Sequence, residues 1–536
     1  MNLKKNLPLV FLFLFAVGLR ATGLKLGLPS ETGGLTTLHP DESVTFFSLE
    51  RMKPAELDFY PGDVALTWGT LHLYTVGAIL KTLDIAGVIK IGGRESLKGS
   101  LGEVDKMYLS ARWLSVVFGA LAVVALYFVG SLFLSGRAAM AAALLLAVSQ
   151  APVMASYLVK TDSMMLFFAL VSVYFSLKLL REPSTRNYAL AGLFLGLAFV
   201  TKYSAALVAF FPFAAHFYHA YKARSPLFNI KKLLVFALSG LGAFLVCNPY
   251  FILRTRDEVN AMFFNFSKGK MGGDVFSLYV SYFSTVLPAA FGWSMVPFGL
   301  AGVARWLKGG VSEKTLIAAY CVLFLVWAGA TSGTYVLYAL PLAPFLFLAA
   351  GDLAASLLGR RWGKLLVVAV FAQVLSYTLY LKYHYVSDYT IKTADAWIRE
   401  NLPEGATVAI AKNDTWTPFV VRRHAGSFKV IEGAASQAPL MEAVVELGKI
   451  YAKADYVVLS ECEYNFTRSM PEKYPAEAAA IEKIFAGTRE VKRFSRGLPR
   501  YVLPFQYKYA YGSQPPLELQ VNFMNPDILV LKVDKK

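Results

Sequence analysis

Long apolar runs, separated by short polar connectors, fill about the first 380 residues of the chain. A helix of about 20 apolar residues can cross the hydrocarbon core of a bilayer. The pattern therefore predicts about eleven membrane-spanning helices, at roughly 7–28, 110–134, 138–158, 163–181, 188–202, 203–221, 232–253, 279–305, 315–332, 335–357 and 364–382. The runs at 188–202 and 203–221 are short and continuous, with Lys202 at the break.

The distribution of Lys and Arg predicts how these helices are oriented. Alternating spans place five basic connectors on one side, at Arg137, 178–186, 222–232, 305–314 and 360–364. The short connectors on the other side, 159–162 and 332–335, hold a single cation. Basic connectors mark the cytoplasmic side, and the first run lacks a small-residue cleavage site. We therefore expect a multi-pass protein of the cell membrane with a cytoplasmic N-terminus.

This orientation sends two long regions outward, a first outer loop at about 29–109 and everything after about 385. Residues 386–536 show short apolar runs at 407–411, 456–459 and 528–533, separated by turn residues such as those at 403–405 and 512–515. This pattern is typical of a small α/β domain. The predicted architecture is mainly α: a polytopic transmembrane helical bundle (residues 1–385) and an extracytoplasmic soluble α/β domain (386–536) that binds an acceptor or stabilises the bundle.

Composition agrees with a membrane protein, because 56% of residues are hydrophobic and only 17% are charged. A soluble protein carries about 25% charged residues. The net charge of +17 comes from clusters between apolar runs, where cations set orientation and meet anionic lipid headgroups. No nucleic-acid partner is expected. Three Cys residues show no pairing or metal-ligand spacing.

Acidic residues stand at two predicted helix starts on the outer side. Asp41 and Glu42 follow Pro40 in the first outer loop, and Asp162 opens the fourth apolar run. Carboxylates favour the positive end of a helix, so ordinary helix starts are one interpretation. Acids that converge at one membrane face beneath a long loop favour a functional site.

Cations flank the same region. Lys202 interrupts the apolar stretch 193–211. An ionisable residue in a membrane run indicates function, although snorkelling to the interface is an equal alternative. The outward loop after the seventh run adds a cationic lip that suits a lipid phosphate, formed by Arg254, Arg256, Lys268 and Lys270. His39 and His72 in the first loop are weaker candidates, since a cap and a packed core histidine explain them simply.

The first 380 or so residues resemble the C-type glycosyltransferases. The resemblance is to the branch that includes protein O-mannosyltransferases and the bacterial transferases that add aminoarabinose to lipid A. Five stretches carry the resemblance by their order and spacing: Asp41-Glu42, Ala111-Arg112-Trp113-Leu114-Ser115, Lys160-Thr161-Asp162-Ser163, Gly196-Leu197-Ala198-Phe199-Val200-Thr201-Lys202 and Tyr338-Ala339-Leu340-Pro341-Leu342-Ala343-Pro344. One position departs from the family, which often has an arginine where Leu337 stands.

The resemblance implies transfer of a sugar, with inversion, from a polyprenyl-phosphate donor on the extracytoplasmic face. A phosphate leaving group needs no general acid, so one carboxylate base is enough. By similarity Asp41 is that base, and Glu42 orients it or binds the acceptor. Asp162 positions the acceptor or a metal.

Other site residues also follow from the resemblance. The cations that would bind the donor phosphate are Lys202, Arg112, Arg254 and Arg256. His39, Tyr60, His72 and Tyr338 would line the acceptor or substrate. A divalent metal ion held by Asp41 and Asp162 is an open question, because some relatives use one and others do not.

The acceptor would be a glycolipid, a polysaccharide or a protein, and the sequence does not choose among them. Two further interpretations stay open: an oligosaccharyltransferase or O-antigen ligase, and a secondary transporter. A transporter would be expected to show internal repeats and charges at the bilayer midplane. No convincing repeat is seen, and the candidate charges cluster at the outer ends of the runs.

Overall fold

The computed structural model describes residues 3–62, 68–224, 226, 229–268, 275–310, 312–331, 336–387, 389–412, 417–418, 421, 428–435, 439–469, 471, 474–496 and 525–535. The chain divides into two compact units. Unit 1 holds Met1–Leu24, Asp41–Gly93 and Lys106–Leu379, and unit 2 holds Lys25–Pro40, Arg94–Asp105 and Tyr380–Lys536.

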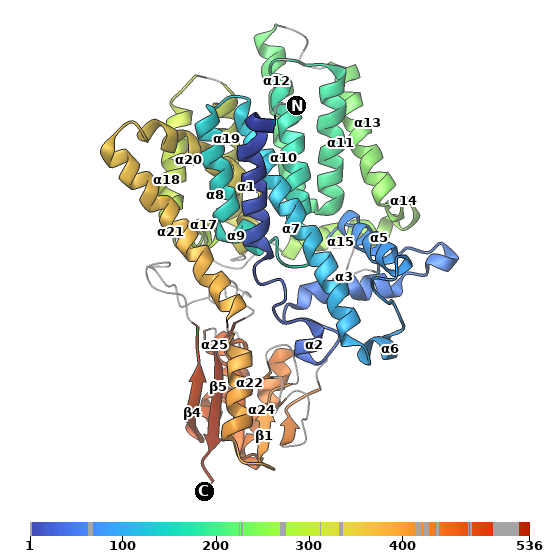
Figure 1. Cartoon of the computed structure of the whole chain (residues 1–536), viewed down its shortest axis with the longest axis vertical. Coiled ribbons are helices and arrows are strands. Elements are labelled where there is room, and N and C mark those ends of the chain that lie inside the picture. Colours follow the sequence, from blue (N-terminus) through green and yellow to red (C-terminus); the bar gives the residue numbers. More distant parts are fainter. Residues whose placement is uncertain are drawn as a thin grey trace. The chain divides into compact units, whose positions relative to one another are not determined.

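Unit 1 is helical, and several of its helices run side by side (Figure 1). Its first half contains α1 (Leu3–Ala21), α3 (Pro40–Arg51), α5 (Leu71–Ile85), α7 (Leu101–Ser131), α8 (Gly136–Val148), α9 (Gln150–Met154), α10 (Asp162–Lys178) and α11 (Thr185–Thr201). Its second half contains α12 (Phe210–Lys222), α13 (Ile230–Cys247), α14 (Tyr250–Leu253), α15 (Thr255–Lys268), α16 (Val275–Ser281), α17 (Leu287–Phe291), α18 (Met295–Leu307), α19 (Glu313–Thr331), α20 (Ala343–Leu357) and α21 (Arg361–Val386).

Short irregular helices join some of these elements. They are 3-10 helices at Pro54–Glu56, Tyr203–Ala209 and Val336–Ala339, and a π-helix at Tyr282–Val286. The segment at Tyr203–Ala209 follows Lys202, which has extended backbone dihedrals (φ −158°, ψ 125°) and ends α11. The predicted break at Lys202 is therefore a real interruption between two helices.

Helices occupy parts of all eleven predicted membrane runs, but the count of eleven spans is not confirmed. Within the described part of the chain, three helical segments are long and apolar enough to cross a bilayer: Leu101–Ser131, Ile230–Cys247 and Arg361–Asn401. The pair Tyr282–Phe291 and Met295–Leu307, bent by 103°, would be a fourth if it forms one span. Other apolar helices are short, because turns interrupt the run; the extended backbone at Ser149, for example, separates α8 from α9.

Small residues let α11 and α13 approach closely. Gly192 and Gly196 are four residues apart on one face of α11, the spacing that favours close helix pairs in membranes. A Cβ atom on Gly196 would come within 2.2 Å of the backbone oxygen of Gly240, and one on Gly192 within 2.1 Å of the oxygen of Phe236. The contact therefore depends on the absence of side chains at these positions.

Unit 2 contains a five-stranded sheet in the order β2-β1-β3-β5-β4. Its strands are β1 (Thr407–Ile410), β2 (Lys429–Glu432), β3 (Tyr456–Ser460), β4 (Thr488–Phe494) and β5 (Ile528–Val533). Strands β2, β1 and β3 are parallel to one another, while β5 is antiparallel to both β3 and β4. The predicted apolar runs at 407–411, 456–459 and 528–533 thus form strands, whereas the turn at 512–515 lies outside the described residues.

The unit's helices are α2 (Pro29–Thr32), α6 (Arg94–Lys98), α22 (Thr390–Asn401), α24 (Leu440–Ile450), α25 (Glu461–Ser469) and α26 (Pro475–Ala486), with a 3-10 turn at Tyr451–Lys453. Leu447 of α24 and Ile481 of α26 pack with Val457 and Leu529 of the sheet in one buried core. Apolar residues from strands and helices therefore meet as in a small α/β domain.

Candidate functional site

A buried ion pair anchors the start of α3. The Arg112 guanidinium donates to both oxygens of Glu42, from Nε at 2.8 Å and from Nη2 at 2.7 Å, and the two side chains are 1% and 0% exposed. The Val159 N–H also donates to Glu42 Oε1 at 2.9 Å, and Arg112 Nη1 donates to the carbonyl of Leu24. Glu42 thus connects α3 to α7 and to the loop before α10.

Asp41, the neighbour of Glu42, lies in a different environment. Its side chain is 43% exposed, and its Oδ2 lies 2.9 Å from Nζ of Lys160, which is 13% exposed. Both acids stand in the first turn of α3, where the positive end of the helix dipole favours carboxylates. One of the two adjacent acids is therefore buried and bidentate, while the other reaches solvent.

Asp162 and Lys202 form a second ion pair. Helices α10 and α11 pack antiparallel, so the first residue of α10 and the residue after α11 lie at the same end. Nζ of Lys202 lies 2.7 Å from Oδ1 of Asp162, and the side chains are 21% and 4% exposed. Each charge also suits the helix end at which it stands.

His72 is buried close to this pair. Its side chain is 2% exposed and its Nε2 has no hydrogen-bond partner. Burial lowers the pKa of His72 to about 4, against a smaller opposing effect of the Asp162 charge. Gly69 makes this placement possible, because a Cβ atom there would lie within 2.4 Å of the Val200 carbonyl oxygen, and its φ of +103° favours glycine.

Tyr338 is the other predicted lining residue within electrostatic range of these charges. The charges of Asp162, Lys160 and Asp41 all act on its phenol. The side chain of Tyr338 is 46% exposed. Sequence elements separated by up to 300 residues thus converge on one group of charged and aromatic side chains.

Tyr60 and Arg254 meet in a second cluster. The Arg254 guanidinium lies 4.0 Å from the centroid of the Tyr60 ring, a cation–π contact. The Tyr250 hydroxyl donates to Asp58 at 2.8 Å and accepts from the Phe59 N–H at 2.7 Å. Hydrogen bonds from the Tyr250 hydroxyl and from the Tyr60 N–H lower the pKa of Asp58, and the Arg254 charge acts in the same direction.

The remaining predicted site residues are more exposed to solvent than these or lie outside the described residues. Arg256 is exposed at the start of α15. His39 is half-buried in unit 2, and its backbone N–H donates to the Thr37 hydroxyl. Lys270 and the side chain of Lys268 lie outside the described residues.

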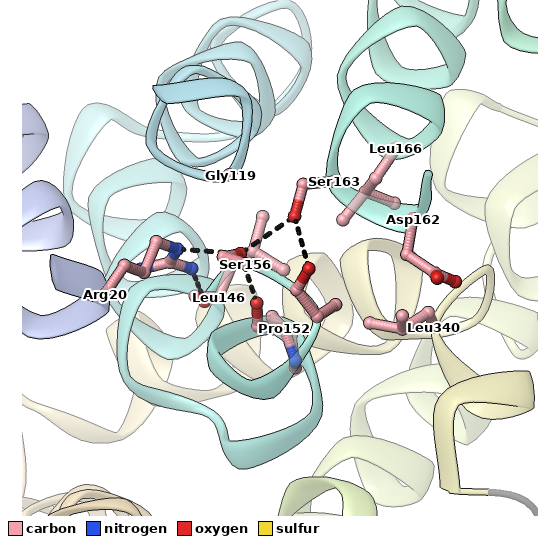
Figure 2. Close-up of a pocket in the computed structure, with 10 residues that line it drawn as sticks. Arg20, Gly119, Leu146, Pro152, Ser156, Asp162, Ser163, Leu166 and Leu340 are labelled. Atoms are coloured by element: carbon pink, nitrogen blue, oxygen red, sulfur yellow. Dashed lines mark hydrogen bonds between the residues drawn. The ribbon is translucent and has the colours of Figure 1, made fainter. Parts of the chain in front are cut away.

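A buried polar network near Asp162 was not anticipated from the sequence. The Arg20 guanidinium donates to Ser156 Oγ at 3.2 Å and to the Leu146 carbonyl, and Ser156 Oγ lies 2.9 Å from Ser163 Oγ (Figure 2). Arg20 also donates to the Ala147 carbonyl. A small pocket with room for about one water molecule is lined by Arg20, Leu146, Ser156 and Ser163, among others. Figure 2 shows Asp162 beside Leu340 at the other end of the pocket from Arg20. The signal in the sequence was Arg20 itself, an arginine at the end of an apolar run.

A buried carboxyl group was also missed. Glu258 is fully buried, accepts from Asn248 Nδ2 at 3.1 Å, and lies 3.4 Å from the Tyr203 hydroxyl. Burial raises the pKa of Glu258, although these two hydrogen bonds oppose the shift. The only hint in the sequence was an acid in the first turn of the helix that follows the cationic Arg254.

The described acids fit a metal ion poorly. Asp41 and Asp162, which could have held a divalent ion, each contact a lysine ammonium group. Across the described ranges, no three His, Cys, Asp or Glu side chains gather as a metal site requires.

Comparison with known proteins supports the resemblance to the C-type membrane glycosyltransferases. Residues 104–252 match the family model described as dolichyl-phosphate-mannose-protein mannosyltransferase. The matched region contains Arg112, Asp162 and Lys202, so the resemblance seen in the sequence is confirmed there. No curated protein sequence matches the chain.

Several solved structures are similar to the chain. ArnT from Cupriavidus metallidurans bound to undecaprenyl phosphate is 14% identical, with 99% of this chain and 98% of that chain covered and a TM-score of 0.48. The oligosaccharyltransferase AglB from Archaeoglobus fulgidus, in complex with an inhibitory peptide and a dolichol-phosphate, is 13% identical, with 92% and 74% covered and a TM-score of 0.47.

Proposed function

We propose that the protein is an integral-membrane glycosyltransferase that moves a sugar from a polyprenyl-phosphate donor to an acceptor hydroxyl on the extracytoplasmic face, with inversion. The observation that carries the proposal is the arrangement around Asp41. This partly exposed carboxylate stands beside a buried ion pair that fixes its helix, and it contacts Lys160, two residues before Asp162, which pairs with Lys202. The family match indicates a glycosyltransferase, and the donor class is our inference.

Asp41 is the base in this proposal. The acceptor oxygen attacks the anomeric carbon, the bond from that carbon to the phosphate oxygen breaks, and the acceptor proton passes to Asp41. The departing phosphate is already stable as an anion, so a second carboxyl acid is unnecessary. Partial exposure lets Asp41 meet an acceptor from the aqueous side.

The neighbouring residues bind and position. Lys202, held by Asp162 at the end of α11, offers a cation to the donor phosphate. Glu42 and Arg112 are buried, so their role is to fix α3 and the loop before α10 rather than to contact the donor. Tyr338 and His72 line the site near Asp162.

The more distant residues supply an entry region for the donor. Arg254, stacked on Tyr60, and the exposed Arg256 follow α13, a described helix that is long and apolar enough to cross a membrane. The α/β region of unit 2 would bind or orient a glycolipid, polysaccharide or protein acceptor. This arrangement corresponds to a multi-pass protein with its N-terminus in the cytoplasm and residues 386–536 outside.

The test is sugar release from a panel of radiolabelled polyprenyl-phosphate sugars by purified protein in liposomes, with membrane extract as the acceptor source. We expect turnover by the wild type and a loss of at least about 100-fold in Asp41→Asn, because general base catalysis contributes about that much. Asp84→Asn is the matched control, since Asp84 is another outer-loop acid that pairs with a lysine (Lys81, 2.7 Å).

Two outcomes would count against the proposal. Full activity in Asp41→Asn would remove Asp41 from the chemistry while leaving the enzyme class intact. If the wild type neither binds nor turns over any donor, and instead moves a solute across the liposome membrane, the protein is a transporter.

A further inference from the structure

Lys160 is a cation for which the sequence analysis predicted no role. Hydrogen bonds hold its backbone in place. The N–H of the preceding Val159 donates to buried Glu42, and the Lys160 carbonyl accepts from the Ser115 hydroxyl at 3.3 Å. Two residues later, Asp162 is fixed against Lys202. With the loop anchored on both sides, movement of Lys160 is confined to its four-carbon side chain.

The contact between Lys160 and Asp41 conflicts with base catalysis. An ammonium group 2.9 Å away stabilises the charged carboxylate and makes it a weaker proton acceptor. For Asp41 to take the acceptor proton, this contact must weaken before the chemical step. The donor phosphate is an anion that can replace Asp41 as the partner of Lys160.

We propose that Lys160 exchanges partners during the reaction, moving from Asp41 to the donor phosphate and so freeing Asp41 only when the donor is bound. This inference rests on the proposed function. In the donor complex, Lys160 neutralises the phosphate oxygen that keeps the electron pair of the broken bond, and Asp41 accepts the acceptor proton. After release of the polyprenyl phosphate, Asp41 loses its proton to solvent and pairs with Lys160 again.

The two ion pairs differ in a way that favours Lys160 over Lys202 for this exchange. The carboxylate of Asp162 is 4% exposed, whereas that of Asp41 is 43% exposed. A pair with one solvated partner is weaker and opens at lower cost than a pair whose acid is buried. Asp162 and Lys202 are also each favoured by the helix end at which they stand. That pair therefore persists while the Asp41 pair opens.

Partner exchange predicts a gain in donor affinity when the competing carboxylate is removed. We would measure the dissociation constant of undecaprenyl phosphate, and separately of dolichyl phosphate, for purified full-length protein in detergent. Asp41→Asn should bind the lipid phosphate roughly threefold to tenfold more tightly than the wild type, since about 1 kcal/mol of ion-pair energy no longer opposes binding. Lys160→Met should bind more weakly, and Lys160→Arg should restore much of the affinity.

The double variant Asp41→Asn/Lys160→Met separates exchange from a structural effect. Without Lys160 the loss of Asp41 should give no gain, so the two substitutions are strongly non-additive. Asp84→Asn and Lys81→Met alter an exposed pair of the same type and should leave the affinity unchanged. Thermal unfolding of each variant in the same detergent establishes that it is folded.

Each failure has a distinct meaning. If the wild type binds the lipid phosphate but Asp41→Asn binds it no more tightly, partner exchange is wrong and the proposed function stands. The same holds if the gain persists in the double variant. If the wild type binds neither lipid phosphate and transfers no sugar, the proposed function itself is overturned, and the exchange with it.

Discussion

The buried pair of Glu42 and Arg112 offers the sharpest test of how the site is supported. Replacing Arg112 with Met removes the guanidinium, keeps most of the apolar volume, and leaves a carboxylate that is 0% exposed. Glu42 would retain the Val159 N–H as a donor, which cannot neutralise its charge. Breaking a buried pair by removing one partner costs about 3–5 kcal/mol.

The converse change, Glu42→Gln, leaves the Arg112 charge buried, so we expect a loss of similar size in the free energy of unfolding. The double variant Glu42→Gln/Arg112→Met removes both charges of the pair, and the amide oxygen introduced at position 42 can still accept from the Val159 N–H. Its cost should be well below the sum of the single costs, by roughly 2 kcal/mol or more.

The assay is denaturant and thermal unfolding of the purified protein in one detergent, with Arg181→Met as the control. Arg181 lies 2.8 Å from Glu313, but the arginine is 61% exposed, so the control should lose about 1 kcal/mol or less. Additive costs in the double variant, or single costs no larger than the control, would refute the view that Glu42 and Arg112 form a desolvated anchor.

Three further predictions concern packing and pH. Gly196→Ala should destabilise by about 1–3 kcal/mol, since its Cβ would overlap a backbone oxygen on α13, whereas Gly242→Ala, with open space, should not. The contribution of His72 to stability should fall by about 3 kcal/mol from pH 6.5 to pH 4, because the unfolded chain protonates His72 first. His72→Gln should therefore lose less stability than the wild type over this range, whereas His219→Gln should follow the wild type. Glu258→Gln should unfold at a higher temperature than the wild type at pH 7, and this difference should vanish towards pH 4.5. The reason is that burial raises the pKa of Glu258, so the wild type loses stability as the pH rises and the buried carboxyl group ionises.

The helical runs could be predicted because apolar length is a strong signal. The sequence placed Asp162 and Lys202 near the same membrane face, and the structure shows that they form an ion pair between two antiparallel helices. The 40 residues that separate them in the chain correspond to the lengths of α10 and α11 and the connector between these helices. The number of spans could not be predicted, since a run of apolar residues does not reveal turns such as the one at Ser149.

The sequence did not reveal which charged residues, far apart in the chain, form ion pairs. The family resemblance implied that Arg112 binds the donor phosphate, whereas the structure places it against Glu42, 70 residues earlier in the chain. Nothing in either segment indicates its partner, because burial and pairing arise only when α3 packs against α7. Lys160 was visible two residues before Asp162, yet its significance depends on the contact with Asp41.

Two adjacent acids with opposite environments explain how one short segment can serve both structure and chemistry. A buried acid in a bidentate pair resists movement, because separating it from its partner exposes an uncompensated charge in a medium of low dielectric constant. A half-exposed acid can change partners at little cost, since water compensates whichever contact is lost. Because Asp41 and Glu42 are consecutive residues on one helical turn, the rigidity of Glu42 limits the positions available to the Asp41 carboxylate. In the proposed mechanism, the reactivity of Asp41 therefore depends on Glu42 remaining buried, because an exposed acid at both positions would lack the fixed geometry that base catalysis requires.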